Sequence, residues 1–375
     1  MITTVPLDGG IAARLRGVFV LACRAALVVS LSGCASRPLQ TFTADTTPMM
    51  LVPVSAAGVT DERARFREIF CAVLDERRAV LPDHVPCEQA LTTLVDEPDG
   101  MGDPVTLEPS RAGLTAVFVP GIGWDCFSDW LKPQNTVGTH LQSQGYGFDV
   151  IDIDSLSSSS ANARRIRDAV LAMKVADASP SLVLIGYSKG AVDVLEAVTQ
   201  YPEIRPRIAA IVSLAGAING SPLANTADQF DAALLRHWPG ARCTEGDGGA
   251  LDSLRPAVRQ HWLARNPLPK DMRAYSVVTM PKPQNISAVL RPIHAKLAQI
   301  DERNDSQVLF HDQVIPGSAL LAYLDADHWA AAVPVARSRD IITTIFVDHN
   351  AYPREALMEA IMRMTEEDIG LNASM

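Results

Sequence analysis

Residues 181–195 read SLVLIGYSKGAVDVL, and this segment joins an apolar run to a helical pattern through a glycine-bounded turn. The first five residues have the length and composition of a buried strand. The turn, Gly186-Tyr187-Ser188-Lys189-Gly190, places a serine between two glycines. Larger side chains at the glycine positions would collide with the neighbouring strand and helix. We therefore predict that Ser188 stands on a strained turn as an exposed nucleophile; the alternative is an ordinary strand-to-helix turn that happens to carry a serine.

Alternating strands and helices extend from this turn in both directions. The chain has 375 residues, 47% of them apolar, which is enough to bury a large core. Predicted strands cover residues 114–119, 148–153, 181–185, 208–214, 273–279 and 319–324, and predicted helices cover 161–175 and 191–200. Apolar strands separated by helices favour a mostly parallel central sheet with helices on both faces, so the predicted fold class is α/β.

A serine hydroxyl is a poor nucleophile unless a base accepts its proton. In hydrolases built on this kind of turn, the acid and the histidine follow the serine in the chain. We predict His328 as the base, because it comes directly after the apolar run at residues 319–324 and so would lie at the carboxyl edge of the sheet. Among the other histidines that follow the serine, we expect His294, His311 and His349 to be structural or exposed.

The carboxylate that would orient His328 is predicted to be Asp305, in the sequence Arg303-Asn304-Asp305-Ser306. Its role would be to hold the imidazole and stabilise the imidazolium without taking the proton. Asp301 and Asp312 are alternative acids. Asp325 and Asp327 are interpreted as loop residues beside the base.

An oxyanion hole requires two backbone N–H groups directed at the developing charge. One is predicted to be the N–H of Lys189, the residue after the nucleophile. The other is predicted to be the N–H of Ile122, in the loop Val119-Pro120-Gly121-Ile122-Gly123-Trp124 that follows the first strand. The side chain of Lys189 needs no catalytic role and is expected to lie at the surface or in a salt bridge.

These motifs together resemble the α/β-hydrolase superfamily, and within it the bacterial lipases and esterases. The likeness covers residues 110–350 and includes the segment 213–224, which is similar to the one after the next strand in such lipases. It departs at Pro120, where many lipases have the histidine of a His-Gly pair. The resemblance implies hydrolysis of a small-molecule or lipid ester through an acyl-enzyme, with Ser188, His328 and Asp305 as the triad and no cofactor.

The N-terminus has the features of a targeting segment. Arg14, Arg16 and Arg24 supply positive charge, and an apolar stretch at residues 25–31 follows. This stretch is too short for a membrane-spanning helix, which needs about 20 apolar residues. Leu31-Ser32-Gly33-Cys34 resembles the lipobox of bacterial lipoproteins, although Arg24 interrupts the apolar region. The resemblance implies a signal peptide over residues 1–33, lipid on Cys34 and a membrane-anchored location in the cell envelope; the alternative is a plain secreted protein.

The remaining chain divides into three further parts. Residues 34–60 are rich in Thr, Pro, Ala and Ser and are predicted to be a flexible tether. Residues 61–110 are predicted to be a helical extension, and residues 111–375 the α/β-hydrolase domain. An insertion at about residues 219–270 is interpreted either as a cap over the active site or as a surface excursion. The helix of the extension, residues 61–80, shows one apolar face: Phe66, Ile69, Phe70, Val73 and Leu74.

Four cysteines beyond Cys34 suggest disulfides in an exported protein. Cys71 with Cys87 is the preferred local pair, which leaves Cys126 to pair with Cys243; buried free thiols are the alternative. No metal site is expected, because no Cys-x-x-Cys pair or His cluster accompanies them.

The formal net charge of −10 argues against nucleic acid as a partner, because phosphates would be repelled. Two other functions remain compatible with the sequence. One is a thioesterase or acyltransferase that uses the same triad, and the other is a non-catalytic envelope lipoprotein that retains the fold.

Overall fold

The computed structural model describes residues 58–94, 97–126, 136–174, 180–226, 244, 246–337 and 347–373. These residues belong to one compact unit, residues 39–375. The predicted signal peptide, Cys34 and residues 34–57 of the predicted tether lie outside the described residues. Across the described part of the chain, every helix is too short or too polar to cross a membrane.

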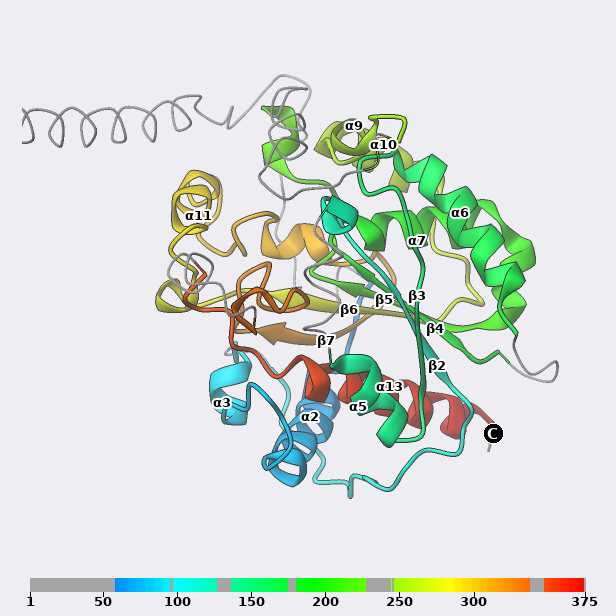
Figure 1. Cartoon of the computed structure of the whole chain (residues 1–375), viewed down its shortest axis with the longest axis vertical. Coiled ribbons are helices and arrows are strands. Elements are labelled where there is room, and N and C mark those ends of the chain that lie inside the picture. Colours follow the sequence, from blue (N-terminus) through cyan, green and yellow to red (C-terminus); the bar gives the residue numbers. More distant parts are fainter. Residues whose placement is uncertain are drawn as a thin grey trace, which may run out of the picture. The chain divides into compact units, whose positions relative to one another are not determined.

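The centre of this unit is a seven-stranded sheet in which every neighbouring pair of strands is parallel. Its order is β1-β7-β6-β5-β4-β2-β3 (Figure 1). The strands are β1 (Thr60–Asp61), β2 (Thr115–Val119), β3 (Gly147–Val150), β4 (Leu182–Tyr187), β5 (Ile208–Leu214), β6 (Ala274–Thr279) and β7 (Ala319–Leu324). The predicted parallel α/β class is confirmed. Because all strands are parallel, the loops after β2, β4, β6 and β7 emerge at one edge.

Helices cover both faces of the sheet (Figure 1). One face carries α6 (Ser159–Ala172) and α7 (Lys189–Gln200), packed on the inward side chains of Val117 and Leu184. The other face carries α2 (Arg63–Arg77), α5 (Val137–Ser143) and α13 (Arg354–Ala373). The remaining helices are α3 (Cys87–Ala90), α9 (Ala250–Ser253), α10 (Pro256–Arg265) and α11 (Arg291–Leu297), with 3-10 turns η3 (Pro202–Arg207), η4 (Pro222–Asn225), η5 (Pro283–Asn285), η6 (Phe310–Gln313) and η7 (Val335–Arg337).

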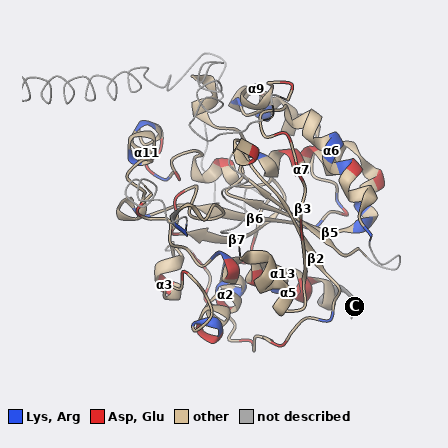
Figure 2. Ribbon diagram, in the orientation of Figure 1, with Lys and Arg blue, Asp and Glu red and all other residues tan. Residues whose placement is uncertain are grey.

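Burial on both faces explains the composition of the strands. The five inner strands, β7, β6, β5, β4 and β2, contain no charged residue, and the charged side chains lie on helices, on loops and on the two edge strands (Figure 2). A charge in such a strand would be buried without water on either face. Alternate residues therefore reach opposite layers: Phe118 contacts the layer of α2 and α13, whereas Val117 contacts that of α6 and α7.

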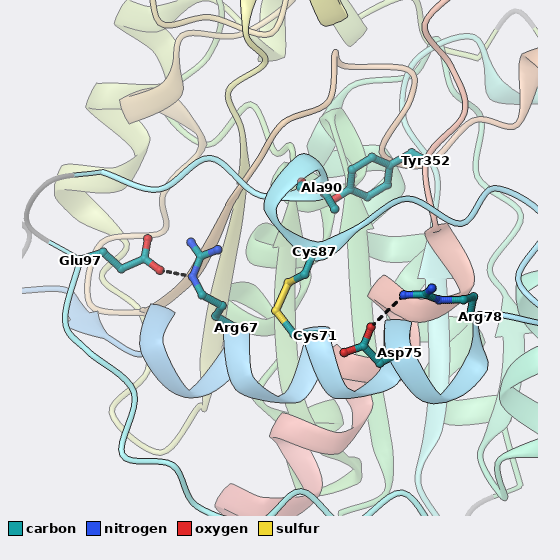
Figure 3. The surroundings of a disulfide bond; sticks show 8 residues. All are labelled: Arg67, Cys71, Asp75, Arg78, Cys87, Ala90, Glu97 and Tyr352. Atoms are coloured by element: carbon teal, nitrogen blue, oxygen red, sulfur yellow. Dashed lines mark hydrogen bonds and ion pairs between the residues drawn. A yellow bond between two sulfur atoms is a disulfide. The ribbon is translucent and has the colours of Figure 1, made fainter.

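The predicted N-terminal helix forms as α2, and its five apolar residues are all fully buried. It packs against α13 and β7, and Arg65 pairs with Glu367 of α13 at 2.8 Å. The predicted Cys71–Cys87 disulfide is present and joins α2 to α3 (Figure 3). Cys243 lies outside the described residues, so its pairing with Cys126 stays a prediction.

The insertion predicted at residues 219–270 is described only in part, because residues 227–243 and 245 lie outside the described residues. Its described parts include η4, α9 and α10. Residues 246–250 pack on the loop after β3. Asp247 accepts hydrogen bonds from the backbone N–H of Ser158, at 2.6 Å, and from its hydroxyl, at 2.5 Å.

Candidate active site

The turn after β4 holds Ser188 in a strained backbone conformation, with φ at 55° and ψ at −124°. A non-glycine residue in this region of backbone space costs about 1–3 kcal/mol, which the surrounding structure must supply. The flanking glycines make the turn sterically possible. A Cβ at Gly186 would lie 2.4 Å from the Cα of Ala191, and one at Gly190 would lie 2.2 Å from the carbonyl oxygen of Val119.

The loop after β2 passes directly against this turn. A Cβ at Gly121 would lie 2.8 Å from the Cβ of Ser188 and 3.1 Å from the carbonyl oxygen of Tyr187. The absence of a side chain at Gly121 therefore lets the next residue, Ile122, approach the serine.

The structure brings the three predicted residues together from three loops at the carboxyl edge of the sheet. The hydroxyl oxygen of Ser188 lies 2.9 Å from Nε2 of His328, and Nδ1 of His328 lies 2.7 Å from Oδ2 of Asp305. Ser188 follows β4, Asp305 precedes η6, and His328 follows β7. His328 is 3% exposed and Asp305 is fully buried, so the bond between them is shielded from water, whereas Ser188 is half-buried and its bond to His328 is only partly shielded.

Four further donors satisfy the carboxylate of Asp305. The backbone N–H groups of Gln307 and Val308 donate to Oδ1 at 2.9 and 2.8 Å. The hydroxyl of Thr279 and the side-chain amide of Gln313, at 3.3 Å, donate to Oδ2, the oxygen that faces His328. These bonds offset the desolvation of a fully buried carboxylate. Sequence reasoning missed Thr279 and Gln313; the position of Thr279, at the carboxyl end of β6, was the one available signal.

His328 is fixed through its backbone as well as its ring. Its N–H donates to the carbonyl oxygen of Asp305 at 3.0 Å, and its carbonyl oxygen accepts the phenol of Tyr187 at 2.9 Å. The rings of Tyr187 and His328 also pack with their centroids 5.2 Å apart. The residue before the nucleophile thus supports the base, a role that the sequence analysis did not assign.

The alternative acids have other partners. Asp301 pairs with Arg303 at 2.8 Å, and Asp325 accepts the N–H of Lys282 at 2.8 Å. Asp327 accepts the N–H of Ser287 and of Ala330, each at 2.9 Å, and burial raises its pKa. Asp312 lies in η6, and burial raises its pKa to about 7.

The alternative histidines lie on other elements. His294 belongs to α11, and burial lowers its pKa. His311 belongs to η6, and burial lowers its pKa to about 4. His349 lies 3.6 Å from the carboxylate of Asp348 and is partly exposed.

Two backbone N–H groups are free to face the site. Lys189 is the first residue of α7, so its N–H has no partner within the helix. Within the described ranges, the N–H of Ile122 has no hydrogen-bond acceptor either. The next N–H along that loop, of Gly123, is already used by the hydroxyl of Ser155 at 2.9 Å. Within the described residues, both predicted oxyanion donors therefore lack a protein acceptor.

The side chain of Lys189 is fully buried and forms an ion pair with Asp193, with Nζ 2.7 and 2.8 Å from the two carboxylate oxygens. Of the two expected environments, surface or salt bridge, the structure shows the salt bridge. In the described part of the chain, no group of three or more His, Cys, Asp and Glu side chains is placed to hold a metal ion.

Comparison with known proteins finds likeness in solved structures. No family model and no curated protein matches the chain. The crystal structure of the metagenomic carboxyl esterase MGS0156 matches with 38% identity and a TM-score of 0.80, over 88% of this chain and 100% of that one. The lipase BlEst2 of Bacillus licheniformis, in its propeptide form, matches at 19% identity and a TM-score of 0.50, over 61% of this chain and 49% of that one. This second match supports the fold alone.

Proposed function

Since the chain belongs to the α/β-hydrolase family, we propose that it is a serine hydrolase that cleaves carboxylic esters. The likeness to a carboxyl esterase supports ester hydrolysis in general. The geometry around Ser188 supports the finer proposal, in which Ser188, His328 and Asp305 are the catalytic residues.

In the proposed reaction, the hydroxyl oxygen of Ser188 attacks the ester carbonyl while Nε2 of His328 takes its proton. Asp305 holds the imidazole through Nδ1 and stabilises the imidazolium. The N–H groups of Ile122 and Lys189 bind the negative oxygen of the tetrahedral intermediate. His328 then gives its proton to the leaving alcohol, and the acyl group remains on Ser188. A water molecule, activated by His328, attacks the acyl-enzyme and releases the carboxylic acid.

The observation that carries this proposal is the unbroken chain from hydroxyl to imidazole to carboxylate, at 2.9 and 2.7 Å. Its members are separated by 140 and 23 positions in the sequence, so the turn at residue 188 and the loops at 305 and 328 converge only through the fold. An ordinary strand-to-helix turn would need neither a base nor an acid behind it. The strained backbone at Ser188 also supports a catalytic role for this residue, because backbone strain is concentrated at functional sites.

The first prediction tests the nucleophile directly. Replacement of Ser188 by Ala should abolish labelling by a fluorophosphonate probe and reduce hydrolysis of p-nitrophenyl esters by about 10⁴-fold or more, since no other group can take the acyl chain. A matched control is Ser143→Ala, on an exposed position at the end of α5, which should label and turn over as the parent protein does. Labelling that survives in Ser188→Ala would refute the assignment, and a parent protein that neither labels nor hydrolyses any ester would favour a non-catalytic role.

We further propose that a lipid on Cys34 anchors the protein to a membrane of the bacterial cell envelope. This proposal is supported by the basic and apolar N-terminal segment and by the lipobox-like sequence alone.

A further inference from the structure

Helix α7 begins at a residue of the proposed site whose backbone is strained. Its N-cap is Ser188, with φ at 55°, and this serine makes no side-chain capping bond to the helix. The hydroxyl that would ordinarily cap the first turn is directed to His328 instead, at 2.9 Å. A missing cap costs a helix about 1 kcal/mol, and the strained backbone adds to that cost. Something else must therefore hold the first turn of α7 in place.

The ion pair between Lys189 and Asp193 spans that first turn. The two residues stand at positions i and i+4, and both side chains are fully buried. Asp193 also accepts a hydrogen bond from the side-chain amide of Asn162, on α6, at 2.8 Å. The pair thus connects the start of α7 to its own second turn and to the neighbouring helix.

A lysine at this position is unfavourable for helix stability alone. The N-terminus of a helix carries partial positive charge, so a cation there is repelled. Burial of both charges also carries a desolvation penalty, and buried ion pairs can often be replaced by apolar residues without loss of stability. A contribution to folding stability therefore does not explain why this buried ion pair is present. A requirement that residue 189 be held in one position does explain it.

We propose that the side chain of Lys189 is a positioning residue, whose ion pair with Asp193 holds the backbone N–H of Lys189 in the oxyanion hole. This inference rests on the proposed function. Because the buried side chain is held at Nζ, a rotation of the backbone at residue 189 that relieved the strain at Ser188 would have to strain or break this ion pair. The N–H then remains directed at the place where negative charge develops.

The expected signature is a loss of kcat with little change in KM. The oxyanion forms only in the transition state and intermediate, so a displaced N–H weakens their binding more than that of the ester. Loss of a whole oxyanion donor lowers kcat by about 10²–10³-fold. A donor that is loosened but still present should cost less, roughly 10- to 100-fold.

Helix α7 offers a matched control in its second buried ion pair. Glu196, two turns further along, pairs with Arg259 of α10 at 2.7 Å, and both side chains are less than a tenth exposed. This pair interacts with Lys189 and Asp193 through longer-range electrostatics, but its hydrogen bonds, which include those to Ile218 and between its own two members, do not run to residue 189. Burial raises the pKa of Glu196, as it raises that of Asp193, so the two pairs experience similar environments.

The experiment compares apolar replacements of the two pairs. Lys189→Met alone leaves the buried carboxylate of Asp193 without its cation and can unfold the protein, so the decisive variant is Lys189→Met with Asp193→Leu. The control is Arg259→Met with Glu196→Leu. For each, kcat and KM for a p-nitrophenyl ester are measured well below the midpoint of thermal unfolding, together with the inhibition constant of a trifluoromethyl ketone, which mimics the oxyanion.

The first double variant should lose roughly 10- to 100-fold in kcat and a similar factor in ketone affinity, with KM within about threefold of the parent. The control should keep kcat within about twofold. Equal kcat in the parent and in Lys189→Met with Asp193→Leu would overturn the positioning role, as would equal losses in both double variants. A parent protein that a fluorophosphonate does not label would instead refute the proposed function itself.

Discussion

The turn that carries the nucleophile has no room for a methyl group at position 190. A Cβ there would lie 2.2 and 2.5 Å from the carbonyl oxygens of Val119, the last residue of β2, and Pro120, the residue after it. Backbone atoms cannot rotate away as a side chain can. An added methyl group must therefore push α7 away from the loop that carries Ile122.

We therefore expect Gly190→Ala to lower the free energy of unfolding by about 2–3 kcal/mol and to lower kcat as well. Urea denaturation and ester hydrolysis measure the two effects. The control is Gly370→Ala in α13, where a new Cβ meets nothing within 4 Å and should be neutral or stabilise by up to about 1 kcal/mol. A Gly190→Ala protein as stable as its parent would show that the turn is less confined than the structure indicates.

Asp312 should make the free energy of unfolding depend on pH, in a direction that follows from the shift of its pKa. Burial raises its pKa from 3.8 to about 7, so the folded protein holds this proton at pH values where the unfolded chain releases it. The contribution of Asp312 to the free energy of unfolding is therefore most favourable below about pH 4. It becomes less favourable as the pH rises toward 7 and stays low at higher pH. His311, 3.6 Å away, cannot compensate, because burial lowers its pKa to about 4 and its ring is neutral over most of this range.

Replacement of Asp312 by Asn removes this dependence. The variant should be more stable than its parent by roughly 1–3 kcal/mol at pH 8, and the difference should vanish near pH 4. Denaturation curves at several pH values give the difference directly. Asp75→Asn, at a side chain that is 77% exposed, should show no such trend. A gain that is the same at pH 4 and pH 8 would mean that the carboxyl of Asp312 does not titrate in this range.

At the scale of elements, the disulfide defines how the N-terminal segment is attached. Cys71 of α2 and Cys87 of α3 close a loop of 16 positions (Figure 3). The residues that follow bind the main sheet: the carbonyl oxygen of Ala90 accepts the N–H of Asp325 and the phenol of Tyr352, each at 2.9 Å. The bond thus holds α3 on α2 while α3 contacts the start of the loop that carries His328.

Replacement of both Cys71 and Cys87 by Ser should lower the free energy of unfolding by about 2–4 kcal/mol, since closure of a loop of this length restricts the unfolded chain by about that amount. Thermal unfolding of the oxidised parent, the reduced parent and the double variant makes the comparison. Reduction also opens the predicted Cys126–Cys243 bond, so it should cost the parent at least this much and cost the variant only what the second bond contributes. A variant as stable as the oxidised parent would show that the loop is already ordered without the bond.

Elements with a strong pattern were predictable from the sequence. β5 and β7 have the bounds expected from their apolar runs, and α2 buries the predicted five-residue stripe. β3 ends at Val150, three residues before its predicted end; Ile151 and Ile153 are buried beyond it, and the N–H of Ile151 still donates to the carbonyl oxygen of Phe118 in β2 at 3.0 Å. β1 has only two residues and forms by pairing with β7 at the edge of the sheet. No local sequence pattern could therefore predict this strand.

Residues of the candidate site that lie in a local sequence motif were predictable from the sequence. Residues that meet only after the chain has folded were not. Ser188 and His328 follow from local patterns at the ends of strands. Asp305 differs from its rivals through Thr279 and Gln313, which stand 26 and 8 positions away and meet its carboxylate only after β6 and η6 have packed. The burial of Lys189 beside Asp193 and Asn162 is likewise a consequence of the packing of α7 on α6, which a sequence pattern does not show.

At the scale of the whole molecule, charge limits how the protein can attach to a membrane. The formal net charge of −10 gives no attraction to the anionic surface of a bacterial membrane. Attachment must then come from acyl chains on Cys34. One chain binds only marginally and reversibly, whereas the two or more chains that a lipobox implies would bind stably. An anchor of this kind is insensitive to salt, unlike one that depends on basic residues.

We therefore expect the full chain, expressed in a bacterium, to remain in the membrane fraction at about 1 M salt and to incorporate a labelled fatty acid. Cys34→Ser should abolish the label, and Cys23→Ser, at the other cysteine of the N-terminal segment, should retain it. Because the proposed catalytic residues all lie beyond residue 180, kcat on a soluble ester should agree within about twofold between the two variants. A parent protein without label, or a label that persists in Cys34→Ser, would leave a plain secreted enzyme as the better description.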